Sequence, residues 1–207
     1  MKRFLAALSF AFSLLATAGP VTYVPQEGDF VFQSLPHGDL VDAIEGASHS
    51  KYSHVGMVIR KNNEWFVREA IGPVIDTPIQ EWIHRGRIHQ AFDAYRLRAP
   101  LQAVVPDLIK ASEAFLGRPY DFRYRMDDEA IYCSELLYKS MLSASGLRLG
   151  KLQKLSELDW RPYRTTIEKY EGGKVPQDRL MITPRSLSEA SALQVVYQGI
   201  VKSARAQ

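Results

Sequence analysis

The sequence predicts one α+β domain. Three runs rich in β-branched and aromatic residues lie in the first half of the chain, and two patterns with apolar residues at helical spacing come later. Strands that follow one another closely, beside helices that follow one another, are typical of an antiparallel sheet packed against helices. At 207 residues the chain is long enough for one domain with a substantial core.

The first strands come early in the chain. Gly28–Phe32 is a run of aromatic and β-branched residues shortly after a proline, and it predicts the first strand. His54–Ile59 and Trp65–Ile71 predict the second and third strands. The asparagine pair at 62–63 between them favours a tight turn, so we expect these two strands to form a hairpin. Residues 34–53 are rich in Gly, Ser and His and indicate a loop.

The middle of the chain mixes short elements. At most a short helix is predicted around Asp39–Ile44, and another at Thr77–Arg85, where Thr-Pro is a capping signal. Phe92–Arg98 predicts a further strand. Pro106–Leu116 has a proline at its start and an apolar face at helical spacing, and Gly117 follows as a stop signal, so it predicts a helix.

The second long helix is predicted from Cys133 to Ala144, and Gly146 ends it. Residues 160–180 are polar and aromatic without a clear period, and they indicate a surface excursion. The segment 181–184 indicates a short strand and a capped turn. Residues 195–197 predict a final edge strand.

Residues 1–18 have the pattern of an export signal. Two basic residues begin the chain, Phe4–Leu15 is apolar, and Ala16-Thr17-Ala18 matches a cleavage site. The apolar stretch is shorter than the about 20 residues that span a bilayer, and no cysteine follows the cleavage site to carry a lipid. We therefore expect a signal peptide at 1–18 and one exported, periplasmic domain at 19–207. An uncleaved membrane anchor is the alternative.

Charge does not point to a polyanionic partner. The net charge is +3, and without Lys2 and Arg3 the balance is 24 basic against 23 acidic residues. Nucleic-acid binding is therefore not expected from the charge of the chain.

Cys133 is the single cysteine of the chain, so it forms no internal disulfide. It stands where a loop gives way to a helical pattern, and a helix N-terminus carries partial positive charge that favours a thiolate. A free cysteine is more often a small core residue. Outside the cytoplasm an unpaired thiol is a hazard unless it is used, which favours a functional interpretation.

His54 is a candidate base because it opens a predicted strand. If Arg60 faces Trp65 in the hairpin, Gly56 lies opposite Glu69, and His54 and Glu69 share a face as diagonal neighbours about 7–8 Å apart at Cα. A register shifted by one residue would send Glu69 to the other face. Glu69 is otherwise a solvated strand carboxylate, and the spacing alone leaves both interpretations open.

The other histidines are His37, His49, His84 and His89, and all lie in loop-like stretches. They have no strand to hold them and indicate surface positions. The sequence has no His-x-x-His spacing, and one cysteine is too few for a structural zinc site, so we expect no metal and no cofactor.

Five segments together carry a resemblance to a known family. In chain order they are Gly28–Phe32, Ser53–Val58, Val67–Ala70, Gly117–Asp121 and Tyr132–Leu136. They resemble the circularly permuted NlpC-type papain-fold hydrolases, the YiiX/YaeF-like group of bacterial envelope proteins. Met181-Ile182-Thr183-Pro184 is similar to the Thr-Pro signature of this group. The histidine before the cysteine marks the permutation, because ordinary papain-like enzymes have the cysteine first.

This resemblance implies a permuted papain-like fold, with the cysteine helix packed on a small antiparallel sheet or barrel. It implies that Cys133 is the nucleophile, His54 the general base, and Glu69 the third polar group. It also implies that Tyr120, and less strongly Tyr132, line the nucleophile's pocket or donate to the oxyanion. Tyr120 is equally compatible with a packed core aromatic.

The function that the resemblance implies is that of a cysteine amidase or peptidase. For an exported enzyme the natural substrate is a peptide, most simply the peptidoglycan stem. Two alternatives stay open: a lipid acyl hydrolase or acyltransferase of the same fold, and a binding module that holds wall fragments or a partner protein without turnover.

Overall fold

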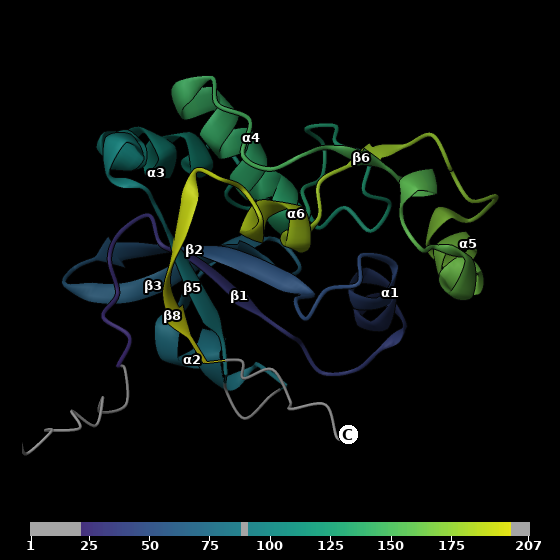
Figure 1. Ribbon diagram of the computed structural model, residues 1–207, viewed down its shortest axis with the longest axis horizontal. Coiled ribbons are helices and arrows are strands. Elements are labelled where there is room, and N and C mark those ends of the chain that lie inside the picture. The colour runs from purple at the N-terminus through teal and green to yellow at the C-terminus, as the bar shows by residue number, and fades with distance from the viewer. Residues whose placement is uncertain (1–21, 88–90, 200–207) are drawn as a thin grey trace, which may run out of the picture.

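A computed structural model describes residues 22–87 and 91–199, and the predicted signal peptide lies outside these ranges. Six antiparallel strands form the main sheet in the order β4-β3-β2-β1-β5-β8 (Figure 1). Its strands are β1 (Phe30–Gln33), β2 (His54–Lys61), β3 (Glu64–Ala70), β4 (Val74–Pro78), β5 (Asp93–Leu97) and β8 (Leu193–Gln198). A two-stranded ribbon pairs β6 (Gln153–Lys154) with β7 (Leu180–Met181).

Six α-helices accompany the sheet in the described residues. They are α1 (Asp39–Ala47), α2 (Ile79–His84), α3 (Val105–Glu113), α4 (Cys133–Ser145), α5 (Arg164–Glu171) and α6 (Pro184–Ser188). Three short 3-10 helices occur at Ala99–Val104, Leu155–Glu157 and Arg161–Tyr163. This arrangement of helices and antiparallel strands confirms the predicted α+β class.

The helices cover the two faces of the sheet unequally. Figure 1 shows α3, α4 and α6 on one side, α2 on the other, and α1 beside α5 at one end. The larger apolar cluster lies under α4, where Met57 and Ile59 of β2 pack with Leu136 and Leu137. A smaller cluster around Trp82 of α2 covers the opposite face.

The hairpin has the predicted register. Arg60 pairs with Trp65 and Met57 pairs with Arg68, so Gly56 stands opposite Glu69. Both turn asparagines have positive φ, as a tight hairpin turn requires. Side chains alternate along a strand, and this register therefore puts His54 and Glu69 on one face.

Gly56 allows a close approach in this hairpin. A Cβ at that position would lie 2.3 Å from Cγ1 of Val67 and 3.3 Å from Cβ of Glu69. The space beside Gly56 is therefore filled by the side chains of Val67 and Glu69.

Several predicted boundaries change in the structure. Helix α1 runs three residues beyond Ile44. Thr77 does not cap a helix, because Val74–Pro78 forms β4 and helix α2 starts only at Ile79. The stretch 160–180 contains α5, whose helical period is hard to see because it has few apolar residues.

Candidate active site

Cys133 occupies the first position of α4, as predicted from the sequence. The start of the helix is tied down on two sides. Ser134 Oγ donates to the carbonyl of Ile182 at 2.9 Å, and the Tyr132 N–H donates to Glu135 Oε2 at 3.2 Å. The Cys133 thiol is free and only 2 % exposed. The helix dipole at this position favours negative charge on the sulfur.

His54 opens β2 and lies against the cysteine. Its Nε2 is 2.5 Å from Oε2 of Glu69, and its ring lies close enough to Cys133 for the thiol to raise its pKa. Since Nε2 is engaged by the carboxylate, Nδ1 is the nitrogen left for the sulfur. The structure thus brings Cys133, His54 and Glu69 together.

Glu69 is fully buried, with an exposed fraction of 0 %, and three groups satisfy its carboxylate. Besides His54, Thr77 Oγ1 donates to Oε1 at 2.6 Å and Arg85 Nη2 donates to the same oxygen at 2.6 Å. Burial alone would raise the pKa of Glu69. The hydrogen bonds from His54 and Thr77 and the charges of His54 and Arg85 outweigh it and lower the pKa to about 2. Glu69 is therefore a carboxylate across the ordinary pH range.

The sequence reasoning did not find Thr77 and Arg85. Thr77 lies opposite Val67 in the β3–β4 ladder, which makes it a diagonal neighbour of Glu69 on the same face. Recognising β4 would have been the signal for Thr77. Arg85 follows α2 directly, and the path of that short helix brings it to Glu69.

The charged form of His54 is the favoured one. Burial lowers the pKa of the ring, but the hydrogen bonds to Cys133 and Glu69 and the negative charges on both raise it, with a net pKa of about 9. The indole of Trp82 lies beside the imidazole, with ring centroids 6.4 Å apart, and screens it from water. A protonated imidazole therefore faces the sulfur at neutral pH.

Tyr120 lies on the other side of the sulfur. Its hydroxyl lies near Cys133, whose charge raises the pKa of the phenol, and 3.2 Å from the Tyr124 hydroxyl. Burial raises the pKa of Tyr120 well above its ordinary value, and Tyr124 and Cys133 add to the shift. The Tyr120 phenol thus keeps its proton and is a hydrogen-bond donor beside the thiol.

The loop that carries Tyr120 is closed on itself. The Ile131 N–H donates to Pro119 O at 2.9 Å, and the Asp121 N–H donates to Ile131 O at 3.3 Å. The Asp121 carboxylate accepts from the backbone N–H groups of Arg123 and Arg125 at 2.9 and 2.5 Å. These bonds make the loop 119–131 a compact unit next to the sulfur.

Tyr132 has a different position from the one expected. Its side chain is fully buried, and its hydroxyl accepts from the Ile182 N–H at 3.0 Å and donates to Met126 Sδ at 2.8 Å. Its own N–H is bonded to Glu135. Both donors of Tyr132 are therefore in use, and the residue supports the start of α4 instead of facing a substrate.

The competing histidines of the described residues lie away from the thiol. His37 pairs with Asp42 at 2.7 Å, and His84 Nδ1 lies 2.6 Å from Gln80 O. His49 is 3.7 Å from Asp159. His89 falls outside the described residues. Over residues 22–87 and 91–199, no group of three His, Cys, Asp or Glu side chains is arranged to hold a metal ion.

An apolar cavity of about 90 Å³ lies close to the site. It is bounded by α1, α5 and the segment before α6, and Tyr124 and Ile182 form the part of its wall nearest the start of α4. Its wall is mostly aliphatic and aromatic, including Leu40, Ile44, Phe122, Leu158, Ile167 and Tyr170.

Comparisons with known proteins place the chain in one family. Residues 24–197 match the model of a family described as permuted papain-like amidase enzymes, YaeF/YiiX. The chain belongs to this family. It is 32% identical over 187 residues to YiiX of Escherichia coli K12, an uncharacterized protein, with 89% of this chain and 92% of YiiX covered.

A solved structure shares the fold. The crystal structure of the metalloprotein YiiX from Escherichia coli O157:H7 matches with a TM-score of 0.80 and 33% identity, over 85% of this chain and 98% of that one. The permuted papain-like fold expected from the sequence is thereby confirmed.

The donor set of the present chain does not suit a metal at the thiol. The Nε2 atom of His54 is bonded to Glu69, and the other oxygen of that carboxylate is held by Thr77 and Arg85. A cation would have to displace these bonds and stand near the Arg85 charge.

No helix of the described residues is long and apolar enough to cross a membrane.

Proposed function

We propose that this protein is a cysteine hydrolase that cleaves an amide bond, with Cys133 as nucleophile, His54 as general base and acid, and Glu69 as the group that orients His54. The observation that supports this most is the position of His54, which is bonded to Glu69 and lies beside the thiol at the start of α4. Nucleophile, base and orienting group are the three parts that covalent catalysis by a thiol needs.

The reaction follows from these positions. The Cys133 sulfur attacks the carbonyl carbon, and the negative charge moves to the carbonyl oxygen. The N–H groups in the first turn of α4 have no acceptor within the helix and can stabilise this oxyanion, and the Tyr120 hydroxyl is a second donor. Protonated His54 gives its proton to the leaving amine. Water, deprotonated by His54, then hydrolyses the thioester and restores the thiol.

The substrate proposal combines the family with the export signal. The family consists of permuted papain-like amidases, and residues 1–18 have the pattern of a cleaved signal peptide. An amidase outside the cytoplasm meets the peptide stems of peptidoglycan, so we propose these stems as substrate. N-terminal sequencing of the secreted protein should return Gly19, and recovery of the Met1 end would remove the argument from location.

A peptidoglycan digest tests the proposed function. Protein starting at Gly19 is incubated with purified peptidoglycan, and new amino groups and released peptides are measured by mass spectrometry. Cys133→Ala is the matched control because it removes only the buried thiol group. We expect release by the wild type and none by Cys133→Ala. Equal release by both proteins would overturn the proposal.

The apolar cavity favours a second candidate, an acyl hydrolase or acyltransferase that acts on lipids. A wall of aliphatic and aromatic side chains suits an acyl chain better than a polar peptide. Phospholipid vesicles in place of peptidoglycan test this candidate. Fatty acid release that requires Cys133, without any peptide release, would replace the first candidate by the second.

A non-catalytic binding module is the third possibility raised by the sequence. A thiol-directed probe separates a binding module from both kinds of enzyme. An active thiol should be labelled quickly at neutral pH, and labelling should fall strongly in His54→Ala. Slow labelling that is equal in both proteins would favour a binding module.

A further inference from the structure

An open groove runs along the loop that carries Tyr120 and ends against α5. Its walls come from Tyr120, Asp121, Phe122, Arg123, Arg125 and Ala130 of the loop and from Lys169 and Tyr170 of α5. Tyr120 lines the groove, and its hydroxyl lies close enough to Cys133 for the thiol to shift the pKa of the phenol. A substrate that reacts at Cys133 therefore has this groove within reach.

The groove is positively charged. Arg123, Arg125 and Lys169 are exposed along it. The carboxylate of Asp121 is buried and turned toward two backbone N–H groups, which leaves it little influence on the open side. Three positively charged side chains thus face the solvent along the groove. The Asp121 carboxylate that lines it is already hydrogen-bonded to the backbone.

The three cations differ in how far they are neutralised. Arg125 lies 3.2 Å from Asp127, and Lys169 lies 3.1 Å from Asp39, both in exposed pairs that contribute little. The Arg123 side chain makes no ion pair or hydrogen bond with any part of the chain that the structure describes; only its backbone N–H and carbonyl are used, by Asp121 and Arg179. Arg123 is therefore the cation most available to a ligand.

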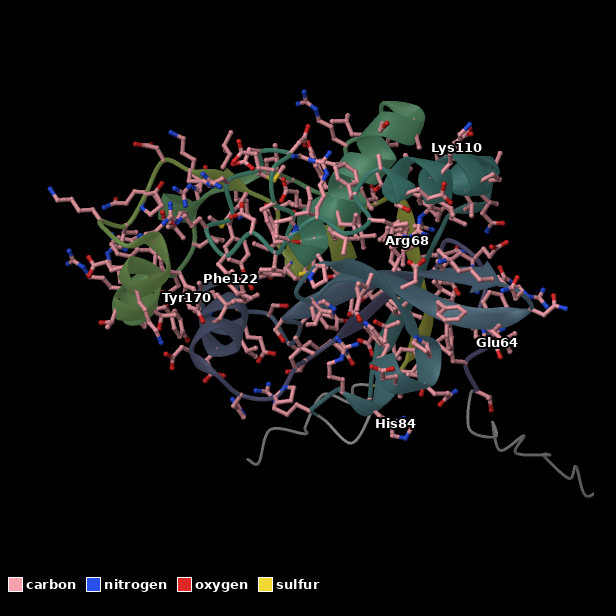
Figure 2. The ribbon with its side chains drawn as sticks, turned by 180° about the vertical axis from the view of Figure 1, so that it is seen from behind. Glu64, Arg68, His84, Lys110, Phe122 and Tyr170 are labelled. Carbon is pink, nitrogen blue, oxygen red and sulfur yellow. The ribbon has the colours of Figure 1, made fainter. Side chains whose placement is uncertain are left out.

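Aromatic rings line the groove beside these cations. Phe122 is 49 % exposed and stacks on Tyr170, with ring centroids 5.7 Å apart and an angle of 8° between the planes. Tyr120 lies against Phe122 at 5.0 Å. Figure 2 shows Phe122 and Tyr170 next to each other at the end of the molecule where α5 lies. The rings offer apolar contact to the carbon stem of a side chain whose charged end reaches the cations.

The loop holds these groups in fixed positions. Its ends are tied together at Pro119 and Ile131, and Lys139 of α4 donates to the carbonyls of Met126 and Asp127 at 2.9 and 2.8 Å. The backbone that carries Arg123 and Arg125 is thus held in place before a ligand binds, which lowers the entropy cost of binding.

From these observations we propose that the groove binds a carboxylate of the substrate and gives the enzyme a preference for acidic peptides. Guanidinium groups bind carboxylates through two parallel hydrogen bonds, and Arg123 is free to do so. The identity of the substrate as a peptide rests on the proposed function. The attraction of anions to Cys133 does not, because it can be measured on the thiol alone.

The first experiment compares two alkylating reagents that differ only in charge. The rates at which iodoacetate and iodoacetamide modify Cys133 are measured at low salt, and their ratio is taken. Removing two positive charges of the groove in Arg123→Gln/Arg125→Gln should lower this ratio about fivefold if both attract the anionic reagent. The difference should shrink at high salt, since screening weakens the attraction of exposed charges.

The control removes two positive charges elsewhere. Lys110 of α3 lies at the opposite side of the molecule from Phe122 and Tyr170 (Figure 2), and Arg148 follows the far end of α4, roughly 20 Å along the helix from Cys133. Lys110→Gln/Arg148→Gln should leave the ratio as in the wild type. An equal ratio in all three proteins, or an equal fall in both double variants, would overturn the groove as an anion site.

A protection experiment identifies the anion. An acidic dipeptide that ends in glutamate, its neutral amide and glycerol phosphate are each tested for slowing the iodoacetamide reaction. We expect protection by the acidic dipeptide in the wild type and its loss in Arg123→Gln/Arg125→Gln. Stronger protection by glycerol phosphate, or equal protection by the neutral amide, would overturn the assignment to a carboxylate. None of these readings requires turnover, so a failed peptidoglycan digest and a failed groove are distinguishable.

Discussion

At the scale of single residues, the arrangement around Glu69 explains why His54 is held so firmly. The carboxylate accepts from His54, Thr77 and Arg85, and none of its surface reaches water. A buried carboxylate with fewer partners would gain a proton and lose its hold on the ring. Thr77 and Arg85 therefore act on the reaction through Glu69, as positioning residues.

Thr77→Val tests this role because valine keeps the shape of threonine and lacks the hydroxyl. One of three bonds to Glu69 is lost, so we expect kcat to fall about three- to tenfold and unfolding free energy to fall by about 1 kcal/mol. The fall in kcat should be smaller than in Glu69→Gln. Thr165→Val, at an exposed position on α5, is the control and should change neither quantity. Unchanged turnover by Thr77→Val would mean that Glu69 does not need this bond.

Tyr120 and Tyr124 differ in what their hydroxyl groups bind, and this allows a matched pair of variants. The Tyr120 hydroxyl lies near the sulfur, whereas the Tyr124 hydroxyl is hydrogen-bonded to the Tyr120 hydroxyl. If Tyr120 donates to the oxyanion, Tyr120→Phe should lower kcat about 100-fold with little change in KM. Tyr124→Phe should lower kcat far less. Similar small losses in both variants would assign Tyr120 to packing.

At the scale of elements, α4 carries a charge that its surroundings tolerate poorly. Glu135 is buried in the first turn, and its carboxylate lies 2.7 Å from the Lys139 ammonium in an ion pair. Burial raises the pKa of Glu135 to about 7, and the partial compensation by Lys139 and the Tyr132 N–H does not cancel it. The helix that presents Cys133 is thus most stable with a proton on Glu135.

The consequence is a loss of stability as the pH rises. The unfolded chain releases the Glu135 proton near its ordinary pKa of 4.5, whereas the folded chain keeps it up to about 7, so this contribution is lost as the pH rises through that window. The shift corresponds to about 3 kcal/mol of unfolding free energy. His54 behaves in the same sense but later, because its contribution is complete below 6.5 and is lost toward about 9. Glu69 loses its contribution only as the pH falls from 4.5 toward about 2.

Glu135→Gln should remove this slope. Between about 4.5 and 6.5, where neither His54 nor Glu69 changes its contribution, the wild type should lose stability and the variant should stay level. Urea unfolding at several pH values measures both. Glu64→Gln, an exposed carboxylate at the start of β3, should keep the wild-type slope. Parallel slopes in wild type and Glu135→Gln would assign the pH dependence to other groups.

The elements also show what could be predicted from sequence. The hairpin register with Arg60 opposite Trp65 is the one expected from the strict alternation of side chains and the asparagine pair at the turn, although β2 ends two residues later and β3 begins and ends one residue earlier than predicted. That register placed Glu69 beside His54. Strand β4 could not be predicted, because Thr-Pro is also a signal for a helix start. Thr77 was missed together with this strand. Helix α5 was missed because it packs mainly through Ile167, too few apolar residues to show a period.

At the scale of the whole molecule, distant parts of the chain meet at one thiol. His54 and Glu69 come from the sheet, Cys133 from the start of α4, and Tyr120 from a loop that is tied back to α4. Sequence motifs could name Cys133, His54 and Tyr120 because each stands in a distinctive segment. They could not show that Arg85 bonds to Glu69 or that Arg123 lines the groove, because arginines outside such motifs are placed only by the path of the folded chain.

The central claim is that Cys133, His54 and Glu69 act as one charged unit, and the titration of His54 tests it most directly. NMR of the protein with labelled histidines gives the pKa of each imidazole ring. In the wild type His54 should titrate at about 9, and in Cys133→Ala, which removes the hydrogen bond and the charge at the sulfur, it should move back toward the ordinary 6.5. A His54 ring that titrates near 6.5 in the wild type, unchanged in Cys133→Ala, would contradict the unit.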